Sequence, residues 1–91
     1  MKEWIYTLKI GKQLRSAIYD ENTENILSIL IEAWKEIHNQ FPDIYDEYDL
    51  ECDIEDIEIV KENDDVDYED IDYLLSQLYD YCDGIGIWID V

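Results

Sequence analysis

Positive charge is scarce in this sequence. Six Lys and Arg residues stand against 25 Asp and Glu residues, and the formal net charge is −19 over 91 residues. Proteins that bind nucleic acid directly present clustered basic side chains to the phosphates. A chain this acidic is repelled by a phosphate backbone, so we expect no direct binding to nucleic acid.

Residues that build common catalytic sites are also few, with three glycines, two cysteines and one histidine. The glycines form no phosphate-binding loop, and neither Cys52 nor Cys82 has a nearby histidine or a CxxC spacing. His38 falls within a predicted helix, and adjacent acids such as Glu55 and Asp56 are common in so acidic a chain. The sequence therefore predicts neither an enzyme nor a bound cofactor.

The chain has no long apolar run. Its longest, ILSILI at residues 26 to 31, is too short to span a bilayer. Charged residues interrupt residues 1 to 16 before the apolar core of a signal peptide develops, and two cysteines in that setting favour reduced thiols. We expect a cytoplasmic protein that does not contact a membrane.

The chain does contain enough apolar material to fold, because 47% of its residues are hydrophobic and 13% are aromatic. Disordered acidic tails are depleted in both. The charge is unevenly placed: residues 1 to 38 have a net charge of −1, whereas residues 39 to 91 have a net charge of −18. Such asymmetry points to a cationic partner.

Apolar residues alternate at both ends of the chain, which predicts two strands. Every second residue from Trp4 to Ile10 is apolar or aromatic, within a predicted strand at residues 3 to 10. The isoleucines of GIGIWIDV, residues 84 to 91, repeat this period. We expect the two strands to pair in one small sheet.

Two segments between these strands have the apolar spacing of helices. Residues 12 to 19 predict a short helix. Residues 22 to 41 predict a longer one that begins at Asn22 or Thr23 and ends before Pro42. The second is apolar over much of its circumference, so we expect it to be the central core element.

A further helix is predicted over residues 68 to 83, with Asp67 as its N-cap and Gly84 directly after its end. Residues 43 to 60 fit either a helical stripe or two short alternating runs. We favour a helix followed by an extended piece near IEIV, residues 57 to 60.

Together these elements predict an α+β fold: a small single domain over residues 1 to 91, with its terminal strands paired and packed against three to four helices. Residues 1 to 42 would form a near-neutral scaffold of strand and helices. Residues 43 to 83 would form an acidic helical face, and residues 84 to 91 the C-terminal strand.

The acids of DLECDIEDIEIVKENDDVDYEDID, residues 49 to 72, alternate as the ligands of a calcium-binding loop do. A loop that starts at Asp49 has Ile54 and Val60 where glycine and glutamate are required. A loop that starts at Asp65 fails at the same two positions. We therefore predict no specific metal site.

The density of charge in this region matches that of a nucleic acid. Residues 43 to 72 hold 16 acids in 30 positions. As one continuous helix of about 45 Å, they would place a charge about every 2.8 Å, against roughly 3.4 Å per phosphate along one DNA strand. A basic groove does not distinguish phosphates from well-placed carboxylates by charge alone.

Six tyrosines are interleaved with these acids: Tyr45, Tyr48, Tyr68, Tyr73, Tyr79 and Tyr81. Tyrosine is common among interface anchors; alternatively, several of these side chains cover the core. The candidate partner-binding residues are Asp43, Asp46, Glu47, Asp49, Glu51, Asp53, Glu55, Asp56, Glu58, Asp64, Asp65, Asp67, Glu69, Asp70, Asp72, Tyr45, Tyr48, Tyr68 and Tyr73.

A small, very acidic domain with an ordinary apolar core resembles the DNA-mimic inhibitors of phages and mobile elements, including anti-CRISPR and anti-restriction proteins. The resemblance covers residues 43 to 83 and rests on composition and charge placement. It implies stoichiometric inhibition of a nuclease or CRISPR effector without a cofactor, in the host cytoplasm if the protein is phage-encoded.

Two other functions remain open. The same features resemble immunity proteins, which cap the cationic active site of a nuclease toxin. A general acidic interaction module for basic proteins, such as a chaperone, is the third alternative. A halophile-like surface is disfavoured because residues 1 to 38 are nearly neutral.

Overall fold

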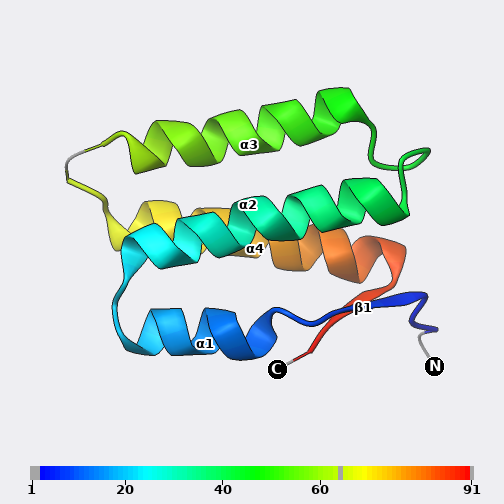
Figure 1. Cartoon of the computed structure of the whole chain (residues 1–91), viewed down its shortest axis with the longest axis horizontal. Coiled ribbons are helices and arrows are strands. Elements are labelled where there is room, and N and C mark those ends of the chain that lie inside the picture. Colours follow the sequence, from blue (N-terminus) through cyan, green and yellow to red (C-terminus); the bar gives the residue numbers. More distant parts are fainter. Residues whose placement is uncertain (1–2, 64, 91) are drawn as a thin grey trace.

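The computed structural model describes residues 3 to 63 and 65 to 90, which form four helices and two short strands (Figure 1). The α+β prediction is confirmed. In Figure 1, α1 and α3 lie at opposite edges of the molecule, α2 runs between them, and α4 lies behind α2. The elements are β1 (Tyr6–Leu8), α1 (Gly11–Tyr19), α2 (Thr23–Gln40), α3 (Glu47–Lys61), α4 (Tyr68–Ile85) and β2 (Ile87–Ile89).

The two strands from opposite ends of the chain pair in parallel, with Tyr6 opposite Ile87 and Leu8 opposite Ile89. The predicted pairing is therefore confirmed, but both strands are shorter than predicted. Residues 84 and 85 belong to α4, and Val91 lies outside the described residues. The sheet is limited in length because helices begin or end close to each strand.

Gly86, and not Gly84, ends α4. Its φ of 91° is left-handed, and its N–H donates to the carbonyl of Cys82. Glycine adopts this conformation without the strain that a side chain causes. A Cβ here would also lie 3.1 Å from the carbonyl oxygen of Glu3, so the turn from α4 into β2 requires glycine at this position.

As predicted, α2 is the central core element. Seven of its 18 residues are buried, and Leu30, Ala33 and Ile37 are fully so. Asn22 is its N-cap, since the Asn22 side chain accepts a hydrogen bond from the N–H of Asn25. This cap satisfies one of the unpaired donors at the start of the helix.

The predicted extended piece at residues 57 to 60 is wrong, because α3 continues without a break to Lys61. Leu50, Ile57 and Val60 lie in or against the core and keep the helical period through these residues. The acidic region is also not one helix over residues 43 to 72, since a turn precedes α3 and a loop separates it from α4.

Candidate partner-binding surface

Among the four helices, α3 carries the densest negative charge, and its sequence explains why it is helical. The side chain of Asp46 caps the N-terminus by accepting from the N–H of Asp49, 2.9 Å away. Acids occupy the first turn and Lys61 occupies the last, an order that the helix dipole favours. Asp46 and Asp49 therefore stabilise α3 in addition to adding charge to it.

The outward surface of α3 has a regular pattern that follows from 3.6 residues per turn. One flank carries Glu47, Glu51 and Glu58, and the other carries Asp49, Asp53 and Asp56. Between the flanks lie Glu55 and three uncharged side chains, of which Tyr48 is 72% exposed and Ile59 is 61% exposed. The third is Cys52, which is also exposed. We call this surface, residues 47 to 59 of α3 facing solvent, the acidic crest.

The carboxylates of the acidic crest have no cationic partner among the described residues. In the part of the chain that the structure describes, none of the seven carboxylates of α3 forms an ion pair. A salt bridge joins Lys35 and Glu32 on α2, at 3.8 Å. The α1 segment, by contrast, carries Lys12 and Arg15 and no acid.

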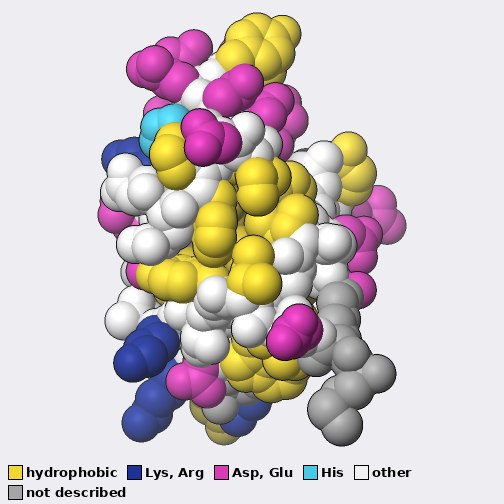
Figure 2. All heavy atoms as spheres, turned by 90° about the vertical axis from the view of Figure 1, so that its right-hand side faces the viewer, with side chains coloured by type: hydrophobic (Ala, Val, Ile, Leu, Met, Phe, Trp, Pro, Cys, Tyr) yellow, Lys and Arg dark blue, Asp and Glu magenta, His cyan; other side chains and the backbone are white. Residues whose placement is uncertain are grey.

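This separation of charge is visible in Figure 2, which views the molecule from the right-hand side of Figure 1. Asp and Glu side chains crowd the top of this face, at the level of α3, and most of the visible Lys and Arg side chains lie at the bottom. Hydrophobic side chains are exposed between the two. The acidic side chains of α3 and the basic side chains of α1 thus lie toward opposite edges of the fold.

The second acidic segment, residues 62 to 72, has a partly structural role. Asp67 caps α4 by accepting from the N–H of Glu69 at 3.1 Å. Glu69 and Asp70 lie in the first turn of α4, where the helix dipole stabilises negative charge. Asp64 lies outside the described residues. This segment is therefore a weaker candidate for partner binding than the acidic crest.

The predicted site residues that the structure describes lie at the surface, with two exceptions. Tyr45 is 2% exposed and belongs to the core, so its assignment as a partner-facing anchor is wrong. Asp53 is half-buried. The exposed members of the set are Asp43, Asp46, Glu47, Tyr48, Asp49, Glu51, Glu55, Asp56, Glu58, Asp65, Asp67, Tyr68, Glu69, Asp70, Asp72 and Tyr73.

Tyr45 holds the start of α3 against the rest of the molecule. Its ring stacks on Trp34 of α2, with centroids 5.1 Å apart, and packs against Tyr81 of α4. Its hydroxyl donates to the carboxylate of Asp53. Its carbonyl accepts from Nδ1 of His38 at 2.9 Å, because a carbonyl oxygen can only accept. His38 therefore has a structural partner in this contact.

The surroundings of Asp53 and Tyr48 on α3 raise the pKa of each side chain. Burial raises the pKa of Asp53, and the nearby charges of Asp56 and Asp49 raise it further, while the hydrogen bond from Tyr45 lowers it. A hydrogen bond with the Cys52 thiol is the main cause that raises the pKa of Tyr48.

Several exposed apolar residues were not singled out from the sequence. Ile44 and Ile59 are 55% and 61% exposed beside or among the acids. Trp4 and Trp88 contact each other edge to face, with centroids 5.1 Å apart. Trp4 belongs to the strand predicted at residues 3 to 10, but in the structure residue 4 precedes β1 and its side chain is 41% exposed.

Residues 3 to 63 and 65 to 90 contain neither a candidate metal site nor a candidate membrane span. No group of three or more His, Cys, Asp or Glu side chains in these ranges could hold a metal ion. No helix in the same ranges is long and apolar enough to cross a membrane.

Comparisons with known proteins gave no match: no family model, curated protein sequence or solved structure is significantly similar to this chain.

Proposed function

We propose that the protein is a stoichiometric inhibitor that presents the acidic crest to the cationic groove of a nucleic-acid-binding protein, in place of phosphates. The target class is a nuclease or a CRISPR effector, and the protein acts in the cytoplasm. The observation that carries the proposal is the acidic crest. Its helix, α3, carries seven carboxylates in 15 residues, none of them in an ion pair within the described residues.

The spacing of these carboxylates supports mimicry of a phosphate backbone. At 1.5 Å of rise per residue, α3 presents one carboxylate for about every 3.2 Å of its axis. One strand of DNA presents a phosphate every 3.4 Å or so. A groove whose Lys and Arg side chains match phosphates would therefore meet a similar density of charge.

The uncharged side chains of the acidic crest favour a protein partner over a merely solvated surface. Tyr48 and Ile59 are well exposed between the two acidic flanks. A surface whose role was solubility alone would gain nothing from exposing them, whereas tyrosine and isoleucine bury area in an interface. The two flanks would contact cations while the residues between them contact apolar parts of the groove.

The first test compares two variants with equal loss of charge. Four exposed acids of the acidic crest are neutralised as Glu51→Gln, Glu55→Gln, Asp56→Asn and Glu58→Gln, which leaves the cap and the half-buried Asp53 intact. The control neutralises four exposed acids elsewhere, as Asp20→Asn, Glu21→Gln, Glu32→Gln and Asp90→Asn. Both variants have a net charge less negative by four.

The partner is first isolated from host extract and identified, and its affinity for each variant is then measured by calorimetry. We expect the crest variant to lose at least tenfold in affinity and the control less than threefold, since local complementarity matters more than net charge. Nucleic acid should displace the wild-type protein from the partner in a one-to-one competition. Equal losses in the two variants, or no competition, would contradict the proposal.

Salt provides a second test of the same proposal. Raising the salt concentration from about 50 to 200 mM should weaken the wild-type complex at least tenfold, because screening and counterion effects act on exposed charges. The same change should affect the crest variant less steeply. An affinity that is flat across this range would exclude charge mimicry.

A third test uses the two cysteines. Cys52 is exposed in the middle of the acidic crest, and Cys82 is buried, so a maleimide reagent should label Cys52 selectively. A bulky label at this position should block partner binding by steric exclusion, whereas the same label at an engineered Ser16→Cys on α1, in a Cys52→Ser background, should not. Full binding of the Cys52-labelled protein would place the interface elsewhere.

A further inference from the structure

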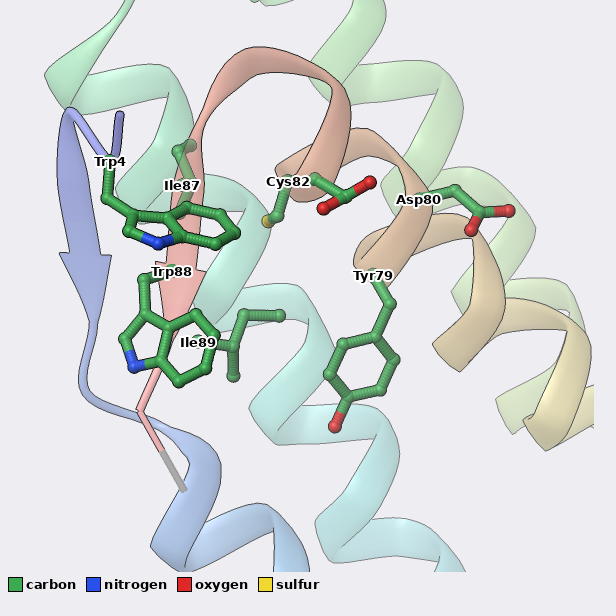
Figure 3. Close-up of a pocket in the computed structure, with 8 residues that line it drawn as sticks. Trp4, Tyr79, Asp80, Cys82, Ile87, Trp88 and Ile89 are labelled. Carbon is green, nitrogen blue, oxygen red and sulfur yellow. The ribbon is translucent and has the colours of Figure 1, made fainter. Parts of the chain in front are cut away.

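A cavity of about 400 Å³ lies between the C-terminal half of α4 and β2, apart from the acidic crest (Figure 3). Its size is within the range of about 300 to 1,000 Å³ typical of small-ligand sites. Three aromatic side chains, Trp4, Trp88 and Tyr79, line it together with Ile87 and Ile89. We call this cavity the indole pocket.

The aromatic rings of the indole pocket are unusually open to solvent. Trp4, Trp88 and Tyr79 are each between 41% and 44% exposed. In Figure 3 the two indoles stand on one side of the pocket, one beside the other, and the Tyr79 ring stands on the opposite side. The faces of such rings carry negative charge density and attract cations, with indole the strongest.

Two acidic residues belong to the lining of the indole pocket. Asp80 and Asp83 line the pocket and lie near the C-terminal end of α4, whose last turn contains no basic residue. The helix dipole disfavours acids at this end and favours cations. In Figure 3 the carboxylate of Asp80 points away from the indoles, so its charge acts from the rim. The pocket thus combines aromatic faces, carboxylates and a helix C-terminus, all of which favour a positive ligand.

The other polar groups at the indole pocket do not supply different chemistry. Burial raises the pKa of the Cys82 thiol to about 12, so this thiol stays neutral and unreactive. Arg15 of α1 lies close enough to Tyr79 to oppose the rise that burial causes in the pKa of Tyr79. This arginine is a like charge beside the pocket and should weaken the binding of a cation there.

We propose that the indole pocket binds one organic cation, the guanidinium or ammonium group of a Lys or Arg side chain carried by the basic partner. The identity of the carrier rests on the proposed function, whereas the chemistry of the ligand does not. The partner would then make two contacts with this chain, many charges along the acidic crest and one side chain inserted beside β2.

The ligand chemistry is tested with a small probe, N-acetyl-arginine methylamide, by NMR of the three indole N–H signals. We expect the signals of Trp4 and Trp88 to shift saturably. The signal of Trp34, which is 4% exposed and stacked on Tyr45, should stay fixed. The citrulline analogue has nearly the same shape without the charge and should produce at least tenfold weaker binding.

Variants define which groups bind the probe. Trp88→Leu keeps apolar volume but removes an indole face, and Asp80→Asn with Asp83→Asn removes both charges. Each should weaken probe binding at least threefold, and Arg15→Gln should strengthen it. The control pair, Glu55→Gln with Glu58→Gln on α3, has the same charge change as the aspartate pair and should leave probe binding within twofold of wild type.

Equal shifts with arginine and citrulline probes would overturn the proposal, as would the absence of any shift or an unaltered affinity in Trp88→Leu.

A second experiment measures the affinity of the partner itself. Trp88→Leu should weaken the partner complex as well, and an unchanged partner affinity would overturn the assignment of the cation to a partner side chain. Probe binding by the four-acid crest variant separates this inference from the proposed function, because the pocket should retain the probe even if the acidic crest proves not to bind a partner.

Discussion

The helices α2 and α3 lie side by side in Figure 1, yet they are determined by different constraints. In α2, seven of 18 residues are buried and three are acidic. In α3, one of 15 residues is fully buried and seven are acidic. Packing decides most positions of α2, whereas α3 needs only a narrow inward stripe to stay in place.

This difference explains how the fold tolerates so much like charge. Carboxylates on α3 repel one another through solvent, where the effective dielectric constant is high and each pair costs little. The inward residues of α3 and the aromatic contacts of Tyr45 hold the helix against that repulsion. The outward surface of α3 is consequently available to a partner. Substitutions of buried residues should therefore lower stability, whereas substitutions on the outward surface of α3 should lower partner binding.

The largest expected loss of stability follows from a substitution in the buried part of α2. Leu30 is fully buried, so Leu30→Ala should cost about 2 to 5 kcal/mol through lost burial and the cavity that remains. The melting temperature should fall by about 10 °C or more. Asn39→Ala, at an exposed position of the same helix, is the control and should have little effect. A normal melting temperature for Leu30→Ala would mean that α2 is not the core of the domain.

A matched pair within α3 tests its narrow attachment. Ile57 is 1% exposed and Ile59 is 61% exposed. Ile57→Ala should destabilise the protein by about 2 kcal/mol and should lower amide hydrogen-exchange protection in α3 before that in α2. Ile59→Ala should change stability by less than about 0.5 kcal/mol but should weaken partner binding. Equal destabilisation by the two substitutions would show that α3 is packed differently.

Much of this fold could be predicted from periodicity. The long apolar stripe of α2 and the caps Asn22 and Asp67 are local signals, and the structure confirms them. The strand and helix ends were less predictable. Gly84 and Gly86 are both plausible helix terminators in the sequence. In the structure Gly86 has the left-handed φ and lies against the carbonyl of Glu3, and neither feature is a local signal.

The sequence predicted which segment is acidic, but it did not predict which of its acids share one surface. In the sequence, the acids of residues 43 to 72 form a single candidate set, because their alternation is compatible with either a helix or a strand. The tertiary structure separates them into caps, a half-buried Asp53 and a solvent-facing crest. Tyr45 shows the same limit, since nothing local distinguishes a core tyrosine from the exposed Tyr48 three residues later.

The next effect concerns the tyrosine that connects the two helices. Tyr45→Phe keeps the ring that stacks on Trp34 but removes the hydroxyl that donates to Asp53. We expect a loss of about 1 kcal/mol by urea unfolding, because Asp53 is half-buried and can regain part of its hydration. The control is Tyr73→Phe, whose hydroxyl contacts Gln77 on an exposed face and should matter little. An unchanged stability for Tyr45→Phe would show that the hydroxyl does not help to hold α3 against the rest of the molecule.

The smallest effect is a pH dependence at Asp53 itself. Burial first, and then the charges of Asp56 and Asp49, raise the pKa of this carboxyl in the folded protein above its ordinary value of 3.8. The folded state thus binds the proton more tightly than the unfolded state, and this contribution to stability is full below the ordinary value and is lost as the pH rises through the folded pKa.

At neutral pH the wild-type protein therefore holds a carboxylate where a neutral group would be favoured. Asp53→Asn keeps an oxygen that can accept from Tyr45 and removes the charge, so it should melt slightly higher than wild type at pH 7. Near pH 4 this advantage should shrink, because Asp53 is then partly protonated. The control is Glu55→Gln, on the exposed surface of the same helix. It also removes one charge from α3 and so relieves repulsion, but at a position that is not buried. If Asp53→Asn and Glu55→Gln change the melting temperature equally at both pH values, the half-buried position of Asp53 has no energetic consequence. The acidic flanks of α3 would then be equivalent.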